Sequence, residues 1–314
     1  MSGCLVCGCE RFARLFRTSD RLYQTTSREF AVVRCGECGL VRLDPQPAPE
    51  ELRQYYPDTY WFVPDRSAAS RLEEAYRRLV LRDHVRFVER ALRHSRARGP
   101  LLDVGCGGGL FLGLMRERGF RVLGLDSSRE AAAIAWRRQN AAAVCALLEN
   151  APFPAEGLAG VTMFHVLEHL YDPRAYLIAA HKLLAPDGRL VVQVPNAASW
   201  QFRLLGRSWN GVDVPRHLFD FRDRDVEKLM EQCGFEVLRH KYFSLRDNPA
   251  GLASSLAPSL DPMARRIRRV QESGRTHLAK DLGYFALVVS SLPFTAVEAA
   301  FGAGSTVMIE ARRT

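Results

Sequence analysis

The sequence predicts an α/β protein in which helices cover both faces of a parallel sheet, preceded by a small metal-binding ribbon. Two observations support this prediction. From Leu101 onward, short apolar runs alternate with segments of helical periodicity, which is the pattern of a doubly wound parallel sheet. Close to the N-terminus, two Cys-x-x-Cys pairs flank a segment long enough for a short hairpin, an arrangement typical of a zinc site.

Composition places the chain among ordinary globular proteins. It has 314 residues, of which 47% are hydrophobic and 25% charged, enough for one large domain and a small one. The net charge of +9 would suit an anionic partner, but only residues 265–269 form a dense basic cluster. We interpret that cluster as a solvated helix face and do not expect a nucleic-acid partner. Because no apolar h-region follows the N-terminus, we expect a cytoplasmic protein.

The N-terminal cysteines are spaced as ligands of one metal ion. In a reducing compartment they favour metal binding over disulfides, and two tight Cys-x-x-Cys turns make a closed tetrahedral site for structural Zn²⁺. Cys9 is a fifth thiol and could compete as a ligand. We therefore predict a zinc ribbon at residues 1–45, which without metal would have too small a core to fold alone. The predicted ligands are Cys4, Cys7, Cys35 and Cys38.

Residues 46–95 are predicted to connect the ribbon to the sheet. Three prolines at residues 45–49 indicate a stiff linker, and a short helix is expected at 50–56. The aromatic stretch at 55–62 either lines a substrate pocket or pins the ribbon to the main domain. Apolar residues at helical spacing predict a helix over 70–94 that packs on the sheet.

The predicted main domain, residues 96–314, begins with a strand, a glycine turn and a helix. The apolar run Leu101–Val104 ends at a five-residue turn with four glycines, and helical periodicity starts at Leu110. Such a turn lets backbone N–H groups and a helix N-terminus approach a nucleotide-type ligand closely. Asp103 lies just before this turn, where its charge would repel a diphosphate but attract an ammonium or sulfonium group.

A second acid ends the next predicted strand, at residues 120–126. The carboxylate of Asp126 can accept both hydroxyls of a ribose. Ser127 and Ser128 are then positioned to cap a helix over 129–139.

The remaining elements continue the alternation. A third strand at 141–148 leads into a turn where the backbone groups of Leu148 and Glu149 would contact an adenine edge. An irregular polar and aromatic insert occupies about residues 200–221. The other expected strands are 160–164, 189–194, 235–243 and 304–312, and the other expected helices are 174–184 and 224–233.

Residues 282–303 form an apolar stretch that is nearly long enough for a membrane span. Because it contains Pro293 and Glu298 and a strand must follow it, we expect a helical hairpin broken at Pro293 within a helical insert at about 250–303. That hairpin would cover the active site, a partner, or a membrane surface, so peripheral membrane contact stays open.

Five segments taken together resemble the ordered motifs of class I S-adenosylmethionine-dependent methyltransferases. The resemblance covers about residues 80–312 and implies their Rossmann-like sheet. The double Cys-x-x-Cys, YYPDTYW and DVPRHLFDF further resemble a zinc-ribbon-bearing bacterial branch that acts on small molecules, sugars or polysaccharide ends and includes relatives of ubiquinone-pathway and deoxysugar methyltransferases. The five segments are DVGCGGG, LGLD, PFP, FHVLEHLYDP and LLAPDGRLVVQVPN.

The resemblance implies S-adenosyl-L-methionine as cosubstrate and in-line methyl transfer to an oxygen, nitrogen or carbon of a small-molecule or glycan acceptor. Holding nucleophile and methyl group in line would supply most of the catalysis, and a base would help with a hydroxyl acceptor. Our candidate bases are His165 and His217, each of which could instead be a neutral hydrogen-bonding residue. The implied cofactor contacts are Asp103, Gly105, Cys106, Gly107 and Gly109 for methionine, Asp126 and Ser127 for ribose, Leu148 and Glu149 for adenine, and His165 for the sulfonium.

Other functions fit parts of the sequence. His165, Glu168 and His169 match the H-x-x-E-H pattern of inverted zinc proteases, but that chemistry needs one helical face and His165 ends an apolar strand. In a weaker version, Glu168 and His169 would hold a divalent metal in a methyltransferase site. A dinucleotide oxidoreductase would share the glycine turn and Asp126 but lacks the third-glycine spacing.

Two further alternatives come from other classes. A zinc-ribbon protein that binds nucleic acid or modifies RNA would use the ribbon and the cluster at 265–269. A protein that binds S-adenosylmethionine without activity would need neither His165 nor His217.

Overall fold

A computed structural model describes residues 3–57 and 68–314. The chain divides into two compact units, and both are assembled from separate stretches of sequence. Most of the predicted aromatic stretch, residues 58–62, lies outside the described residues. The first unit contains residues 1–60, 195–225 and 247–307, and the second contains residues 61–194, 226–246 and 308–314.

The second unit is built on a seven-stranded sheet with the order β10-β11-β8-β7-β4-β5-β6. Five neighbouring strands pair in parallel, namely β8, β7, β4, β5 and β6. β10 and β11 form an antiparallel edge. The predicted parallel α/β sheet is therefore confirmed. The strands are β4 Leu101–Val104, β5 Val122–Asp126, β6 Ala142–Cys145, β7 Leu158–Phe164, β8 Leu184–Pro195, β10 Phe235–Lys241 and β11 Thr306–Arg313.

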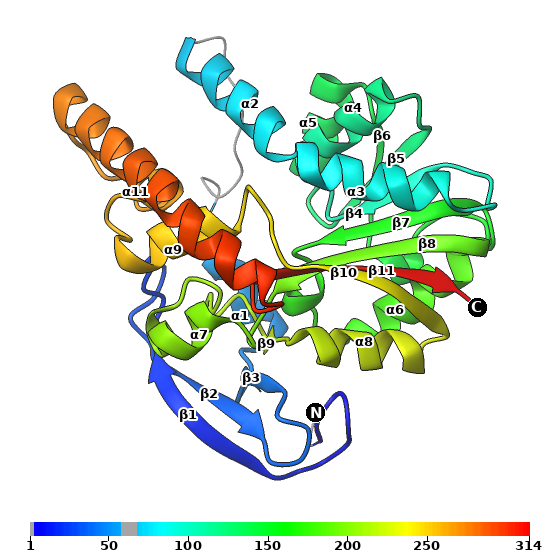
Figure 1. Cartoon of the computed structure of the whole chain (residues 1–314), viewed down its shortest axis with the longest axis horizontal. Helices are drawn as coiled ribbons and strands as arrows, with labels where there is room; N and C mark the ends of the chain where they lie inside the picture. Colours follow the sequence, from blue (N-terminus) through cyan, green and yellow to red (C-terminus); the bar gives the residue numbers. More distant parts are fainter. Residues whose placement is uncertain (1–2, 58–67) are drawn as a thin grey trace. The chain divides into compact units, whose positions relative to one another are not determined.

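Helices lie on both faces of this sheet, as predicted (Figure 1). In Figure 1, α3, α4 and α5 lie on one side and α6 and α8 on the other. A core cluster of apolar side chains from α3, β4 and α4 excludes water from the first of these faces. The helices are α2 Ala68–Val80, α3 Arg82–Arg93, α4 Leu110–Glu117, α5 Arg129–Gln139, α6 Pro173–Leu183 and α8 Asp223–Gln232.

Local signals explain where these helices begin. The Ser128 hydroxyl accepts the Ala131 backbone N–H at 3.2 Å and starts α5 at the predicted residue. The single helix predicted over 70–94 is instead two helices, α2 and α3, with Leu81 between them. Asp83 in the first turn of α3 favours a new N-terminus there, because an acid is stabilised at that end of a helix.

The first unit contains a four-stranded sheet with the order β1-β2-β3-β9. β1 and β2 form the expected antiparallel hairpin between the two cysteine pairs. β9 comes from the segment predicted to be an irregular insert, and it pairs with β3 through Val41 and Asp220. The ribbon therefore shares a sheet with residues far along the chain and does not end as a separate body at residue 45. The strands are β1 Phe12–Thr18, β2 Phe30–Cys35, β3 Val41–Leu43 and β9 Phe219–Asp220.

The helices of the first unit include one that corrects the sequence prediction. α11 runs unbroken through Pro293, so the predicted hairpin is wrong. The proline removes one helical hydrogen bond, and the backbone stays helical on both sides of it. The helices are α1 Pro49–Leu52, α7 Trp200–Leu205, α9 Asn248–Leu256, α10 Pro262–Ile267 and α11 Gly274–Ala300.

Candidate active site

Asp103 is a buried acid near the carboxyl end of the central strand β4. Its carboxylate accepts a hydrogen bond from the Thr162 hydroxyl at 2.6 Å, across the pairing of β4 with β7. The pKa of Asp103 is raised to about 7, chiefly by burial and also by the nearby charge of Asp126, and the Thr162 hydrogen bond and the charge of Arg246 act in the opposite direction. Near neutral pH this acid can therefore take or release a proton when a charged ligand approaches.

The turn after β4 has a backbone that only glycine adopts without strain. Gly105 and Gly109 have φ of 72° and 76°, in the left-handed region. A Cβ atom at Gly105 would lie 2.8 Å from the Val166 side chain, and one at Gly109 would lie 2.8 Å from Ala135. The chain therefore bends tightly here, and α4 begins directly after Gly109.

Asp126, at the end of β5, is tied to this turn. Its carboxylate accepts the backbone N–H of Gly107 at 2.9 Å and that of Ser128 at 2.8 Å. Burial raises the pKa of Asp126, and these two N–H groups partly offset that effect. Asp103, the glycine turn and Asp126 thus lie together at the carboxyl edge of two adjacent parallel strands, where ligands bind in sheets of this kind.

The residues predicted to contact adenine follow the next strand. The N–H of Ala146 donates to the Asp126 carbonyl at 3.1 Å, which brings the end of β6 beside the end of β5. Leu148 is buried in a short 3₁₀ turn, whereas Glu149 is exposed. Ser127 is also exposed at this edge.

His165 follows β7 in a strained backbone conformation, with φ of 56°. Its Nδ1–H donates to the Glu168 carboxylate at 3.1 Å. The side-chain amide of Gln193 donates to its Nε2 at 3.0 Å. A neutral imidazole with its proton on Nδ1 satisfies both bonds, so the structure holds this ring in one orientation.

The zinc-protease alternative does not fit this geometry. That pattern requires its histidines and glutamate on one helical face. Here Leu167–His169 is a single 3₁₀ turn, and His165 precedes it with a left-handed backbone.

His217, the other predicted base, is a buried residue of the first unit. Its Nδ1–H donates to the Gly211 carbonyl at 2.8 Å, which leaves the lone pair on Nε2. The neighbouring Arg216 is fully buried and its guanidinium binds two carboxylates, Asp20 at 2.9 Å and Asp213 at 2.6 Å. This ion-pair group fixes the loop that carries His217, and the sequence pattern alone did not indicate it.

The four predicted zinc ligands come together in the first unit. Their sulfur atoms all lie within 4.8 Å of one another, and the Cys4 and Cys38 sulfurs are 3.4 Å apart. Four sulfurs at about 2.3 Å from a common zinc ion would be about 3.8 Å apart, so the set fits a tetrahedral metal site. The fifth thiol, Cys9, instead accepts the backbone N–H of Arg11.

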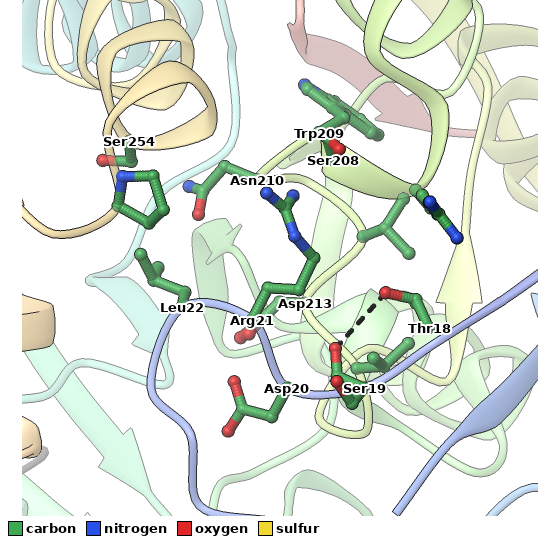
Figure 2. Close-up of a pocket in the computed structure, with 14 residues that line it drawn as sticks. Thr18, Ser19, Asp20, Arg21, Leu22, Ser208, Trp209, Asn210, Asp213 and Ser254 are labelled. Carbon is green, nitrogen blue, oxygen red and sulfur yellow. Dashed lines mark hydrogen bonds between the residues drawn. The ribbon is translucent and has the colours of Figure 1, made fainter. Parts of the chain in front are cut away.

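A pocket in the first unit was not predicted. It is a small, partly open hollow with a cavity volume of about 20 Å³. Figure 2 shows the side chains that face it, with the guanidinium of Arg21, the amide of Asn210 and the indole of Trp209 among them. Hydroxyls of Thr18, Ser208 and Ser254 complete a lining that is largely polar.

Two arginines of the predicted basic cluster, Arg265 and Arg268, bind groups inside the first unit. Arg265 is buried and pairs with Asp281 and Glu272. Arg268 donates to the backbone carbonyls of Ala264 and Pro258. The cluster is therefore not the wholly solvated helix face that the sequence predicted, because Arg265 is buried.

Comparisons with known proteins agree with this geometry. Residues 72–240 match a family model described as "Methyltransferase domain". The ubiquinone biosynthesis O-methyltransferase of Pectobacterium carotovorum is 31% identical over 172 residues, which cover 51% of this chain and 72% of that protein. The one from Pseudomonas aeruginosa is 32% identical over 173 residues, covering 51% and 74%. A solved SAM-dependent methyltransferase from Archaeoglobus fulgidus shares the fold, with a TM-score of 0.50, 18% identity, and coverage of 79% of this chain and all of that one.

Proposed function

This chain belongs to the class I S-adenosylmethionine-dependent methyltransferases, and we propose that it methylates a hydroxyl group of a small-molecule or glycan acceptor. The observation that carries the cosubstrate site is the pair of buried acids, Asp103 and Asp126, on either side of the glycine turn. Two relatives named as O-methyltransferases support oxygen as the acceptor atom.

The cosubstrate would be held by the residues at this sheet edge. S-adenosylmethionine supplies a methyl group that its sulfonium has already activated. Asp103 would bind the cationic methionine part, with the backbone of residues 105–109 close beside it. Asp126 would exchange its hydrogen bonds within the turn for the ribose hydroxyls, with Ser127 nearby. Leu148 and Glu149 would contact the adenine.

The two histidines then take different roles. His165, held between Glu168 and Gln193, would be a positioning residue that shapes the wall near the sulfonium. His217 would be the general base, because its Nδ1–H bond to Gly211 fixes the lone pair on Nε2. As the acceptor oxygen forms its new bond to the methyl carbon, its proton would pass to Nε2 and the carbon–sulfur bond would break.

The chemistry of the first unit supports a hydroxylated acceptor. Side-chain amides, hydroxyls and guanidinium groups hydrogen-bond to sugar hydroxyls and pair with carboxylates or phosphates. The pocket in Figure 2 presents Arg21, Asn210 and Ser208, and the Trp209 ring adds an apolar wall. The hollow itself is too small for an acceptor, so these groups would contact acceptor hydroxyls at its rim.

The cysteine cluster would hold a structural Zn²⁺ ion. Four thiolates fill every position of a tetrahedral ion, so no position remains for substrate. In this assignment Cys4, Cys7, Cys35 and Cys38 stabilise the first unit and take no part in methyl transfer.

Formation of S-adenosylhomocysteine from S-adenosylmethionine, measured with each member of a panel of hydroxylated acceptors, tests the proposal. His217→Gln should lower kcat about 100-fold or more with unchanged affinity for S-adenosylhomocysteine, whereas His94→Gln, a matched change at an exposed histidine of α3's C-terminal end, should do neither. Arg21→Ala should raise KM for the acceptor with little effect on kcat. Full activity of His217→Gln on every accepted substrate would contradict the base assignment.

A further inference from the structure

α11 exposes a long apolar face. Leu282, Phe285 and Val289 are 60%, 57% and 46% exposed, and Phe301, just past the helix end, is 73% exposed. The face continues from Leu278 to Phe301, about 35 Å at the rise of an α-helix. Singly exposed apolar residues are normal, but a contiguous apolar face of this length marks an interaction surface.

The opposite face of α11 is buried and mostly polar, with Val288 as its buried apolar residue. Ser291, Thr295 and Glu298 point inward, and the Glu298 carboxylate accepts both the backbone N–H and the side-chain amide of Gln201, each at 2.9 Å. A surface helix of a soluble protein has the reverse arrangement, with its apolar stripe on the core. α11 is thus built with its apolar side outward.

Packing within the first unit keeps α11 on the protein. The Tyr284 hydroxyl hydrogen-bonds Ser254 of α9 at 2.9 Å, and Trp200 packs on Phe294 and Phe301. Among the described residues, α11 is the helix long and apolar enough to cross a membrane. Because its buried polar face is satisfied by protein groups, a position on a membrane surface fits better than a span.

The width of the exposed face favours a lipid surface over a helical partner. At 100° per residue, the outward apolar positions between Leu278 and Phe301 cover an arc of about 160°. A two-helix seam uses a narrower stripe of a and d positions. A broad face suits a continuous apolar medium.

Charge around α11 favours anionic lipid. Residues 200–209 and 257–303 contain eight arginines or lysines and four acids. All four acids already have partners within the first unit: Asp261 accepts Ala264 N–H, Glu272 pairs with Lys280, Asp281 with Arg265, and Glu298 with Gln201. Eight cations against four acids give these ranges a positive net charge, and Arg269 and Arg275 are exposed beside the start of α11.

We propose that α11 docks this protein on the surface of an anionic lipid bilayer, with its outward apolar face at the acyl boundary and Arg269 and Arg275 at the headgroups. This inference is independent of the acceptor and of the residues assigned to catalysis. Attachment of this kind combines apolar burial with electrostatic attraction.

Co-sedimentation of the full chain with vesicles tests the docking surface. We expect binding to phosphatidylcholine vesicles that contain phosphatidylglycerol, and much weaker binding to phosphatidylcholine alone or at high salt. Leu282→Glu with Phe285→Glu should weaken binding about tenfold or more. Ile178→Glu, a matched change at an exposed apolar residue of α6, should leave it unchanged. An unchanged Tm reports that each variant is folded.

A second set of variants separates the electrostatic contribution to vesicle binding from the apolar one. Arg269→Ala and Arg275→Ala should each weaken binding to anionic vesicles about fivefold without changing binding to neutral ones. Absence of wild-type binding to anionic vesicles at low salt would overturn the proposal. So would a stable dimer in light scattering that Leu282→Glu with Phe285→Glu dissociates while vesicle binding stays unaffected, because the face would then bind a second copy.

Discussion

A single buried carboxyl group determines how cofactor binding should depend on pH. Asp103 has a pKa of about 7 because it is buried, so much of it is neutral at and below neutral pH. A cationic ligand binds the ionised form, and at lower pH a proton must first leave. The charge of Asp103 is thus coupled to occupation of the site.

We therefore expect affinity for S-adenosylhomocysteine to rise up to tenfold per pH unit below 7 and to level off above it. Titration calorimetry across this range measures the slope. Asp103→Asn should bind more weakly at pH above 7 and lose most of the pH dependence. An identical slope in both proteins would show that another group controls binding.

The same group affects stability with a defined sign. The pKa of Asp103 is raised above its unfolded value of 3.8, so the stability it contributes is present below about pH 4 and is lost as pH rises through 7. Asp103→Asn should thus raise Tm, relative to wild type, more at pH 8 than at pH 5. A larger gain at pH 5 in thermal denaturation would contradict the raised pKa.

Some site residues could be predicted from sequence and others could not. Asp103 and Asp126 could be predicted because each lies at or one residue before the end of a local apolar run, and strand ends meet at one edge of a parallel sheet. Gln193 was not found, because it is one residue of a buried strand and reaches His165 only through the pairing of β7 with β8.

At the scale of elements, the cysteine ribbon should depend on metal. We expect one Zn²⁺ per chain by elemental analysis, and a lower Tm after chelation, because metal binding contributes directly to folding in small sites. Cys4→Ser should lower both zinc content and Tm, while Cys145→Ser, at an exposed thiol of the second unit, should change neither. Full zinc content in Cys4→Ser would refute the assigned ligand set.

Pro293 lies inside α11, although a proline in a helical pattern normally ends or kinks the helix. Proline does remove one helical hydrogen bond, at a cost of about 3 kcal/mol, but packing of α11 within the first unit outweighs that cost. Because the backbone stays helical at this position, Pro293→Ala should stabilise the protein by about 1–3 kcal/mol in urea denaturation. Destabilisation by this change would instead favour the chain break that the sequence pattern predicts.

At the scale of the whole molecule, the sheet was predictable and the division into units was not. Buried parallel strands are continuous apolar runs with helices between them, so the order of elements is visible along the chain. β9 has only two residues, Phe219 and Asp220, and no periodicity can reveal a strand that short. Its pairing with β3 joins the ribbon to residues 195–225 in one unit.

Calorimetric titration with S-adenosylhomocysteine, with NADH as the control ligand, tests the assigned cosubstrate site most directly. We expect micromolar binding of S-adenosylhomocysteine alone. Asp126→Ala should lose that binding and keep the fold, because Asp126 would contact the ribose. No binding of S-adenosylhomocysteine by the wild-type chain, or equal binding of NADH, would contradict a methyltransferase site at Asp103, the glycine turn and Asp126.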